Sequence, residues 1–271
     1  MRSKSDTEVT VEDIFVVGYA QEIVLRSYRP AVSDSVLPIV IYFHGGGFVH
    51  GCLEDAGCAA SAIASRTPAW VISVGYSLAP RFPFPAALED GWRATRWAVE
   101  NARKYNADAK RIGVAGHDAG GNLATCLAAK ARDGGVFSFK AQALLAPLLD
   151  PSMTRISYAS EVLFPDFSER ECARGYRAYL PAMSNRLHPY AAPIESRRLG
   201  GLPPALIASA QNDPLRVEAE NYAGQLIAAG VPTEVTRYAN ASRQALAIHS
   251  TVLADVSAFF TKRFRTAPKI R

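Results

Sequence analysis

Polar and apolar residues alternate in two segments near the start of the chain and then give way to continuous apolar runs. The segments Glu12–Val17 and Glu22–Tyr28 alternate and are rich in β-branched residues, which predicts two paired strands. Leu37–Phe43 is an unbroken apolar run of strand length. Such a run is typical of a strand that is buried on both faces of a sheet.

The same pattern repeats along the rest of the chain, with helical segments between strands. Further strands are expected at Trp70–Val74, Arg111–Ala115, Ala141–Leu149, Pro204–Ala210 and Thr233–Tyr238. Helices are expected at 54–65, Ala86–Lys104, Asn122–Arg132, Leu215–Ala229 and Ser242–Phe264, the last with Ile248, Val252, Val256, Phe259 and Phe260 on one face. This alternation predicts an α/β fold: a mostly parallel sheet of about eight strands with helices on both faces.

One segment interrupts the alternation. Residues 150–200 contain five of the 17 prolines and a single expected helix, Ser168–Tyr179. We therefore predict a small cap or lid insertion at one end of the sheet. The whole chain, 1–271, is predicted to be one large α/β domain, since α/β sheets commonly exceed 200 residues as one unit.

Composition excludes several classes of protein. Hydrophobic residues make up 49% and charged residues 20% of the chain, which is a globular balance and not that of a disordered or fibrous protein. The net charge of +5 is scattered apart from the tail Thr261–Arg265 and Lys269–Arg271. Basic patches with interleaved aromatics are missing, so we expect no nucleic-acid partner.

The sequence also bears on location and metal binding. No apolar run approaches membrane-spanning length and no secretory leader pattern is visible, so we predict a cytoplasmic protein that does not insert into membranes. The four cysteines, Cys52, Cys58, Cys126 and Cys172, form no C-x-x-C pair and lie at no zinc spacing from a histidine. We therefore expect no metal site and no redox motif.

The residues with the most chemical information form a turn, Gly116-His117-Asp118-Ala119-Gly120. A short apolar strand precedes it and an alanine-rich helix follows it. That layout is the strand–turn–helix of a nucleophile elbow, whose usual pattern is Gly-x-Ser-x-Gly. Here an aspartate, Asp118, stands at the position of the nucleophilic serine.

Two further stretches fit the same site. The loop His44-Gly45-Gly46-Gly47-Phe48 follows a predicted strand, and its glycines let backbone N–H groups approach a developing oxyanion. We take Gly45, Gly46 and Ala119 as the candidate oxyanion hole. Asp213 lies just after another predicted strand, where the acid of a catalytic triad follows the nucleophile in chain order.

These motifs carry a family resemblance over nearly the whole chain, from about Glu12 onward. HGGGF, YSLAP with FPFPAALEDGW, the GxDxGGNLA elbow, LPPALIASAQNDPL and AAGVPTEVTRY resemble the hormone-sensitive-lipase family of α/β-hydrolase carboxylesterases. The resemblance implies an esterase that acts on acyl esters through a Ser–His–Asp triad without a cofactor. It also implies that a homodimer through the last strand and helix is common among similar proteins.

The chain departs from that family at the triad itself. The family elbow is Gly-Asp-Ser-Ala-Gly-Gly, whereas this chain has His117 and Asp118 at its second and third positions. The family histidine lies a few residues after the last strand, and counting on from Tyr238 places Arg243 there. Asp213 matches the family acid. The N-terminal cap segment is also expected to be shortened, which would leave the pocket more open.

These departures predict a site without ordinary esterase turnover. Arginine stays charged and cannot act as a general base. We expect the Arg243 guanidinium to lie between Asp118 and Asp213, with Asp118 accepting the N–H groups of Gly46 and Ala119. Such a pseudoenzyme would bind a small apolar or ester-like molecule, or a partner.

Two alternatives remain open at this point. Asp118 could attack carbon itself, as in dehalogenase-like members of the wider fold, or the protein could be an inert interaction scaffold. A working nucleophile needs a base, and the candidates are the five histidines. We expect His44 to brace its loop, His50 to lie in a loop and His249 to lie on a helix face. His44, Phe48, His117 and His188 are the candidate pocket residues, although the His117 side chain is expected to diverge from that of Asp118.

Overall fold

The computed structural model describes residues 8–156 and 168–265. Residues 157–167 of the predicted cap insertion and the basic tail Lys269–Arg271 lie outside the described residues. The strands are β1 Val9–Val17, β2 Glu22–Pro30, β3 Leu37–Phe43, β4 Trp70–Gly75, β5 Ala107–His117, β6 Phe139–Leu145, β7 Ala205–Asn212 and β8 Thr233–Ser242. The α-helices are α1 Gly57–Arg66, α2 Ala86–Asn101, α3 Ala119–Gly134, α4 Glu169–Tyr179, α5 Arg216–Ala228 and α6 Ser250–Phe264.

The eight strands form one sheet in the order β1-β2-β4-β3-β5-β6-β7-β8. The pairs β1–β2 and β2–β4 are antiparallel, and every other neighbouring pair is parallel. The predicted α/β architecture with a mostly parallel sheet of about eight strands is therefore confirmed. Because β3, β5, β6 and β7 run in one direction, the loops after them gather at the same edge of the sheet.

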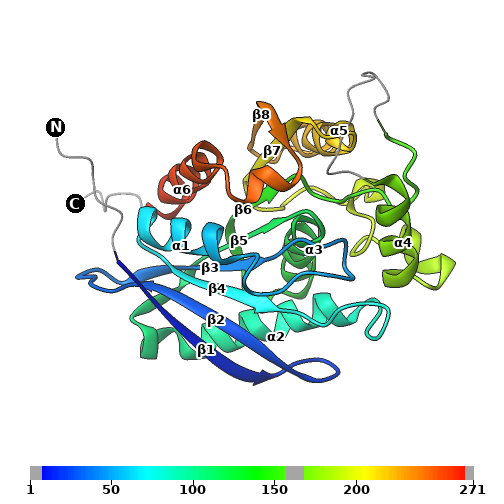
Figure 1. The fold of residues 1–271 in the computed structure, drawn as a ribbon. Coiled ribbons are helices and arrows are strands. Elements are labelled where there is room, and N and C mark those ends of the chain that lie inside the picture. The colour runs from blue at the N-terminus through cyan, green and yellow to red at the C-terminus, as the bar shows by residue number, and fades with distance from the viewer. Residues whose placement is uncertain (1–7, 157–167, 266–271) are drawn as a thin grey trace.

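Helices cover both faces of this sheet, with α1 and α6 over one face and α2 and α3 over the other (Figure 1). The alternation along β3 explains why its sequence is apolar throughout. Ile39, Ile41 and Phe43 belong to the core under α2 and α3, whereas Val40 and Tyr42 belong to the core under α1 and α6. A strand buried on both faces has no position left for a polar side chain.

The C-terminal region differs from the sequence prediction, because the last helix begins at Ser250 and not at Ser242. Strand β8 continues to Ser242, which pairs with Asn212 of β7, and a short 3-10 helix, η4 Gln244–Ala247, follows. His249 is therefore the residue before the helix and not a helix-face residue. Ile248 likewise lies outside the helix and is exposed, so its predicted place on the apolar face is wrong.

The segment after β6 holds the predicted cap region. Strand β6 ends at Leu145, earlier than predicted, because Ala146 adopts a left-handed backbone with φ of 40° and turns the chain. Helix α4 and the short 3-10 helices η2 Met183–Leu187 and η3 Pro193–Glu195 follow within the predicted cap region. Within the described residues, no helix is long and apolar enough to span a membrane.

Candidate functional site

The elbow is a one-residue turn at Asp118 between β5, which ends at His117, and α3, which starts at Ala119. Asp118 has φ of 57° and ψ of −119°, a backbone conformation that non-glycine residues rarely adopt. Holding a residue in this backbone conformation costs on the order of 1–3 kcal/mol of folding free energy, which the surrounding fold must offset. Two glycines make the turn sterically accessible. A Cβ at Gly116 would lie 2.2 Å from the Gly120 oxygen, and a Cβ at Gly120 would lie 2.2 Å from the Phe43 oxygen.

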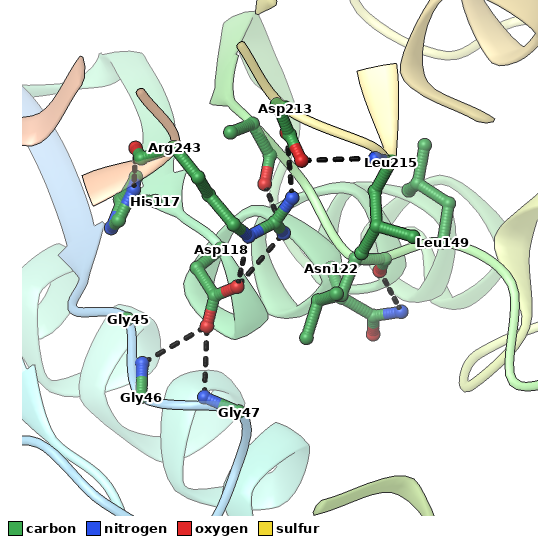
Figure 2. A network of polar contacts seen from close by, with 12 residues as sticks. Gly45, Gly46, Gly47, His117, Asp118, Asn122, Leu149, Asp213, Leu215 and Arg243 are labelled. Carbon is green, nitrogen blue, oxygen red and sulfur yellow. Dashed lines mark hydrogen bonds and ion pairs between the residues drawn. The ribbon is translucent and has the colours of Figure 1, made fainter. Parts of the chain in front are cut away.

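The glycine loop after β3 directs two backbone N–H groups at the elbow aspartate. Gly46 and Gly47 both donate to Asp118 Oδ2, at 3.0 and 2.8 Å (Figure 2). We expected Asp118 to accept from Gly46 and Ala119; Gly46 donates as expected, whereas the second glycine donor is Gly47, which was not among the candidate oxyanion-hole residues Gly45, Gly46 and Ala119. Gly45 packs its Cα against the His117 ring, and its carbonyl faces the Tyr76 hydroxyl at 3.5 Å. The positive φ angles of Gly46 and Gly47, 113° and 58°, turn their N–H groups towards the elbow.

Arg243 lies between the two carboxylates. Its Nε donates to Asp118 Oδ1 and its Nη1 donates to Asp213 Oδ2, both at 2.8 Å. Nη2 donates to the carbonyl oxygen of Ala146 at 2.5 Å. The side chains of Arg243 and Asp213 are 4% and 1% exposed, so this ion pair is almost fully removed from water. The site is shown in Figure 2.

Asp213 reaches this position because β7 ends at Asn212, directly before it. Its second oxygen, Oδ1, accepts the N–H of Leu215 at 2.9 Å, just before helix α5 begins. Both Asp213 oxygens therefore have a donor. The guanidinium of Arg243, in turn, has a partner for each of its three nitrogens, so the buried charges are paired and hydrogen-bonded as low-dielectric surroundings require.

The electrostatics keep both charges fixed at neutral pH. Burial is the largest single influence and raises the pKa of Asp118, but the charge of Arg243, His117 and the N–H groups of Ala119 and Gly47 together outweigh it. The result is a pKa of about 2. Burial alone would lower the pKa of Arg243, whereas Asp213 and Asp118 hold it above its ordinary value. Arg243 therefore has no lone pair with which to accept a proton from a nucleophile or from water.

A cavity of about 730 Å³ opens in front of these residues. The buried Asp118 and Arg243 line it together with Gly46 and Gly47, and residues of 168–178, including much of α4, contribute a further wall. Helix α4 packs tightly on the glycine loop, since a Cβ at Gly175 would lie 2.4 Å from the Gly47 oxygen. This volume lies within the range of small-molecule sites, about 300–1,000 Å³.

The histidine beside the elbow lines this cavity, although we expected its side chain to diverge. His117 Nε2 lies 2.9 Å from the carbonyl oxygen of Arg243. A carbonyl only accepts, so this nitrogen carries the proton. Burial lowers the pKa of His117, which leaves the ring neutral and Nδ1 as the acceptor. His50, which we placed in a loop, also borders the cavity.

The remaining three candidate pocket residues do not border the cavity. His44 is buried and stacks on Tyr76, with ring centroids 4.3 Å apart, so it braces the glycine loop as expected. The Phe48 ring is buried against Tyr179 of α4 at 4.1 Å. His188 packs against the Phe84 ring, at 5.1 Å. All three were proposed from their places in the sequence, and ring packing turns each of them away.

Sequence reasoning missed a third buried carboxyl group near the site, that of Glu218 in α5. It is 1% exposed, and its Oε1 accepts the N–H of Leu149 at 3.1 Å. Burial raises the pKa of Glu218 to about 8, even though Arg243 opposes the shift. The sequence signal would have been its place five residues after Asp213, on the inward side of a helix.

Cys172 of α4 lines the cavity, but it is not an activated thiol. Burial raises the pKa of Cys172 to about 12, so the thiolate that would act as a nucleophile is scarce at neutral pH. Among the residues in 8–156 and 168–265, no group of three or more histidine, cysteine or acidic side chains could hold a metal ion.

Comparison with known proteins places this geometry among esterases. Residues 40–246 match the family described as alpha/beta hydrolase fold. The chain is 41% identical to Esterase LipI of Mycobacterium tuberculosis over 84% of this chain and 72% of that protein. It is 38% identical to Carboxylesterase NlhH of the same species, over 81% of this chain and 70% of the relative.

Solved structures give the same result. A hyperthermophilic esterase from the archaeon Pyrobaculum calidifontis superimposes with a TM-score of 0.85 at 35% identity, covering 93% of this chain and 83% of that one. EstE1, a thermophilic and thermostable carboxylesterase from a metagenomic library, gives 0.88 at 29% identity, covering 95% and 90%.

Proposed function

Because this chain belongs to the α/β-hydrolase-fold family of esterases, we propose that it lacks ordinary carboxylesterase turnover and instead binds a small apolar ligand. Asp118 stands at the nucleophile position, Arg243 at the histidine position and Asp213 at the acid position. In this proposal the three charges form a structural unit and carry out no chemistry. The protein keeps the pocket of an esterase without its reactive groups.

The observation that carries the proposal is the place of Asp118 Oδ2. This oxygen accepts both N–H groups of the glycine loop, at 3.0 and 2.8 Å. In acyl transfer, donors of this kind must be free to stabilise the oxyanion of the tetrahedral intermediate, and loss of one donor costs about 10²–10³-fold in rate. A substrate carbonyl could reach them only by displacing the carboxylate from its own hydrogen bonds.

The absence of a general base at position 243 supports the same conclusion. In a serine protease with such a triad, removing the serine or the histidine lowers the rate by about 10⁶-fold. Both positions are changed here, to Asp118 and Arg243. Their opposite charges match each other, which explains why the two changes are compatible within one buried site.

One alternative has an observation in its favour. Asp118 is ionised, it borders the cavity, and the neutral His117 lies next to it. An active hydrolase could use Asp118 as a nucleophile and His117 Nδ1 as the acceptor for a proton from water. That route requires the Asp118 carboxylate to leave Arg243 and the glycine loop, which hold both of its oxygens.

Turnover of short-chain nitrophenyl esters separates the two functions. The native protein should show no enzymatic turnover, and Asp118→Asn should behave identically. The double variant Asp118→Ser with Arg243→His should gain turnover, since it restores nucleophile and base in an intact pocket. Native turnover that disappears in Asp118→Asn would establish Asp118 as the nucleophile and overturn the proposal.

The binding role has its own test. Purified protein is heated with and without apolar acids, alcohols and esters, and a rise in melting temperature marks a ligand. A chain that is neither stabilised by such molecules nor active on esters would fit the remaining alternative, an interaction scaffold. The cytoplasmic location and homodimer formation stay predictions.

A further inference from the structure

We propose that the cavity beside Asp118 binds an amphipathic carboxylate, with the charged end of the ligand at Arg174 and Arg177 of α4 and its hydrocarbon part inside. This inference rests on the proposed binding function and adds both the chemical class of the ligand and its orientation. The orientation is opposite to that of an ester in a catalytic pocket, where the polar group lies at the elbow.

At the inner end of the cavity, the hydrogen-bond donors of the glycine loop and of Arg243 already have acceptors in the protein. The N–H groups of Gly46 and Gly47 are already bonded to Asp118 Oδ2. The three nitrogens of Arg243 are directed at Asp118, Asp213 and the Ala146 carbonyl. A ligand carboxylate at this end would also meet the negative charge of Asp118, whose pKa of about 2 keeps it ionised.

The outer end of the cavity, by contrast, carries exposed positive charge. Arg174 and Arg177 both line the cavity and both are exposed, in contrast to the buried Asp118. Their spacing of three residues places them on the same side of α4. Among the described residues of the lining, Glu171, one turn earlier, is the other acidic residue besides Asp118, so the two guanidinium groups outnumber the carboxylate of this helix. A guanidinium pairs with a carboxylate through two parallel N–H···O bonds.

Part of the remaining lining suits a hydrocarbon chain, beside the polar His50, His117, Ser168 and Gln244. Val49, Pro80 and Ala178 contribute apolar surface, and the Cys172 thiol stays protonated because burial raises its pKa to about 12. A largely apolar cavity with a few charged groups at one end is the form of site that an amphipathic molecule fills. Burial of the hydrocarbon supplies affinity, and the two arginines select the acid over its neutral derivatives.

Isothermal titration of the full chain with decanoate, methyl decanoate and decanol tests this inference. Decanoate should bind most tightly. Arg174→Gln and Arg177→Gln should each weaken decanoate binding by about fivefold, the size expected for one exposed ion pair. Methyl decanoate and decanol binding should change by less than about twofold. Arg174→Lys, which keeps the charge, should retain part of the affinity lost in Arg174→Gln.

Arg170→Gln is the matched control, because Arg170 is an exposed arginine of the same helix that does not line the cavity. It should leave decanoate binding unchanged. Equal affinities for the acid and its methyl ester, with no effect of the α4 arginines, would overturn the carboxylate assignment while leaving the apolar binding function intact. Equal losses in Arg170→Gln and Arg174→Gln would reduce the effect to general surface charge and also overturn it. Ester turnover, measured separately, reports on the proposed function alone.

Discussion

Arg243 directs two of its nitrogens, Nε and Nη2, at a single oxygen of Asp118, and each lies 2.8 Å from Oδ1. The other oxygen of the carboxylate is thereby left for the Gly46 and Gly47 N–H groups. This division of the two oxygens explains how a carboxylate can occupy the elbow of an esterase fold without an unpaired charge. It also means that the Asp118 side chain connects the glycine loop to Arg243, the residue after β8.

Replacement of Arg243 by methionine should strongly destabilise the fold. Arg243→Met keeps much of the side-chain volume but leaves Asp118 and Asp213 buried without their shared cation, which costs about 3–5 kcal/mol in the free energy of unfolding. Urea denaturation measures this loss. Arg96→Met is the control, since the exposed Arg96 pairs with the exposed Glu100 and should change stability by less than about 0.5 kcal/mol. A loss below about 1 kcal/mol for Arg243→Met would contradict the structural role of the ion pairs.

The ion pair should also make the protein sensitive to acid. The pKa of Asp118 is lowered from 3.8 to about 2 in the folded chain, so folding is favoured by the ionised form. The resulting stability, about 2 kcal/mol, is fully present above pH 3.8 and is lost as the pH falls from 3.8 towards 2. Melting temperatures at pH 6 and pH 3 should therefore differ less in Asp118→Asn than in the native protein. An identical acid dependence of the two proteins would refute this contribution.

Glu218 should act in the opposite pH range. Burial raises its pKa from 4.5 to about 8, so the folded state favours the protonated form. The stability from this preference is fully present below pH 4.5 and decreases as the pH rises from 4.5 to 8. Glu218→Gln mimics the neutral side chain and should raise the melting temperature at pH 8.5, with little change at pH 4.5. A variant that is less stable than the native protein at pH 8.5 would show that the ionised form is the one the fold uses.

The elbow glycine Gly120 should not tolerate a methyl group. A Cβ there would lie 2.2 Å from the Phe43 oxygen, so Gly120→Ala forces α3 away from β3 and should destabilise the protein by about 1–3 kcal/mol. Gly224 in the exposed part of α5 is the matched position, since its Cβ would meet nothing within 4 Å. Gly224→Ala should stabilise the protein by about 0.5–1 kcal/mol. Denaturation curves that rank the two variants in the reverse order would contradict this packing.

The sequence was most informative where one interaction dominates. The continuous apolar run Leu37–Phe43 matches β3 residue for residue, because burial on both faces leaves a clear pattern. The start of the last helix was mispredicted. Residues 242–248 are compatible with a helix, but the pairing of Ser242 with Asn212 and the two carboxylates that hold Arg243 keep the chain out of one. Tertiary contacts override helix propensity in such a segment.

The candidate site, too, has features that the sequence predicted and features that it did not. The order of motifs along the chain correctly indicated that Asp118, Asp213 and Arg243 come together, because they follow strands that end at one edge of the sheet. It could not decide which glycine N–H groups face Asp118, since that depends on the φ angles of Gly46 and Gly47. The direction of a histidine ring is equally invisible in a sequence: the His117 side chain was expected to diverge from the elbow aspartate, but it lines the same cavity.

The backbone of Gly47 contacts both helix α4, in the wall of the cavity, and the buried carboxylate of Asp118. Its N–H holds Asp118, and its carbonyl oxygen lies so close to α4 that only glycine fits at position 175. A displacement of α4 towards the glycine loop would therefore press on the Gly47 carbonyl, one residue's backbone away from the N–H that holds Asp118. Linkage then sets the consequence: a ligand that binds more tightly when Asp118 is ionised must lower the pKa of Asp118 by the same free energy, and so protect the ion pair from acid.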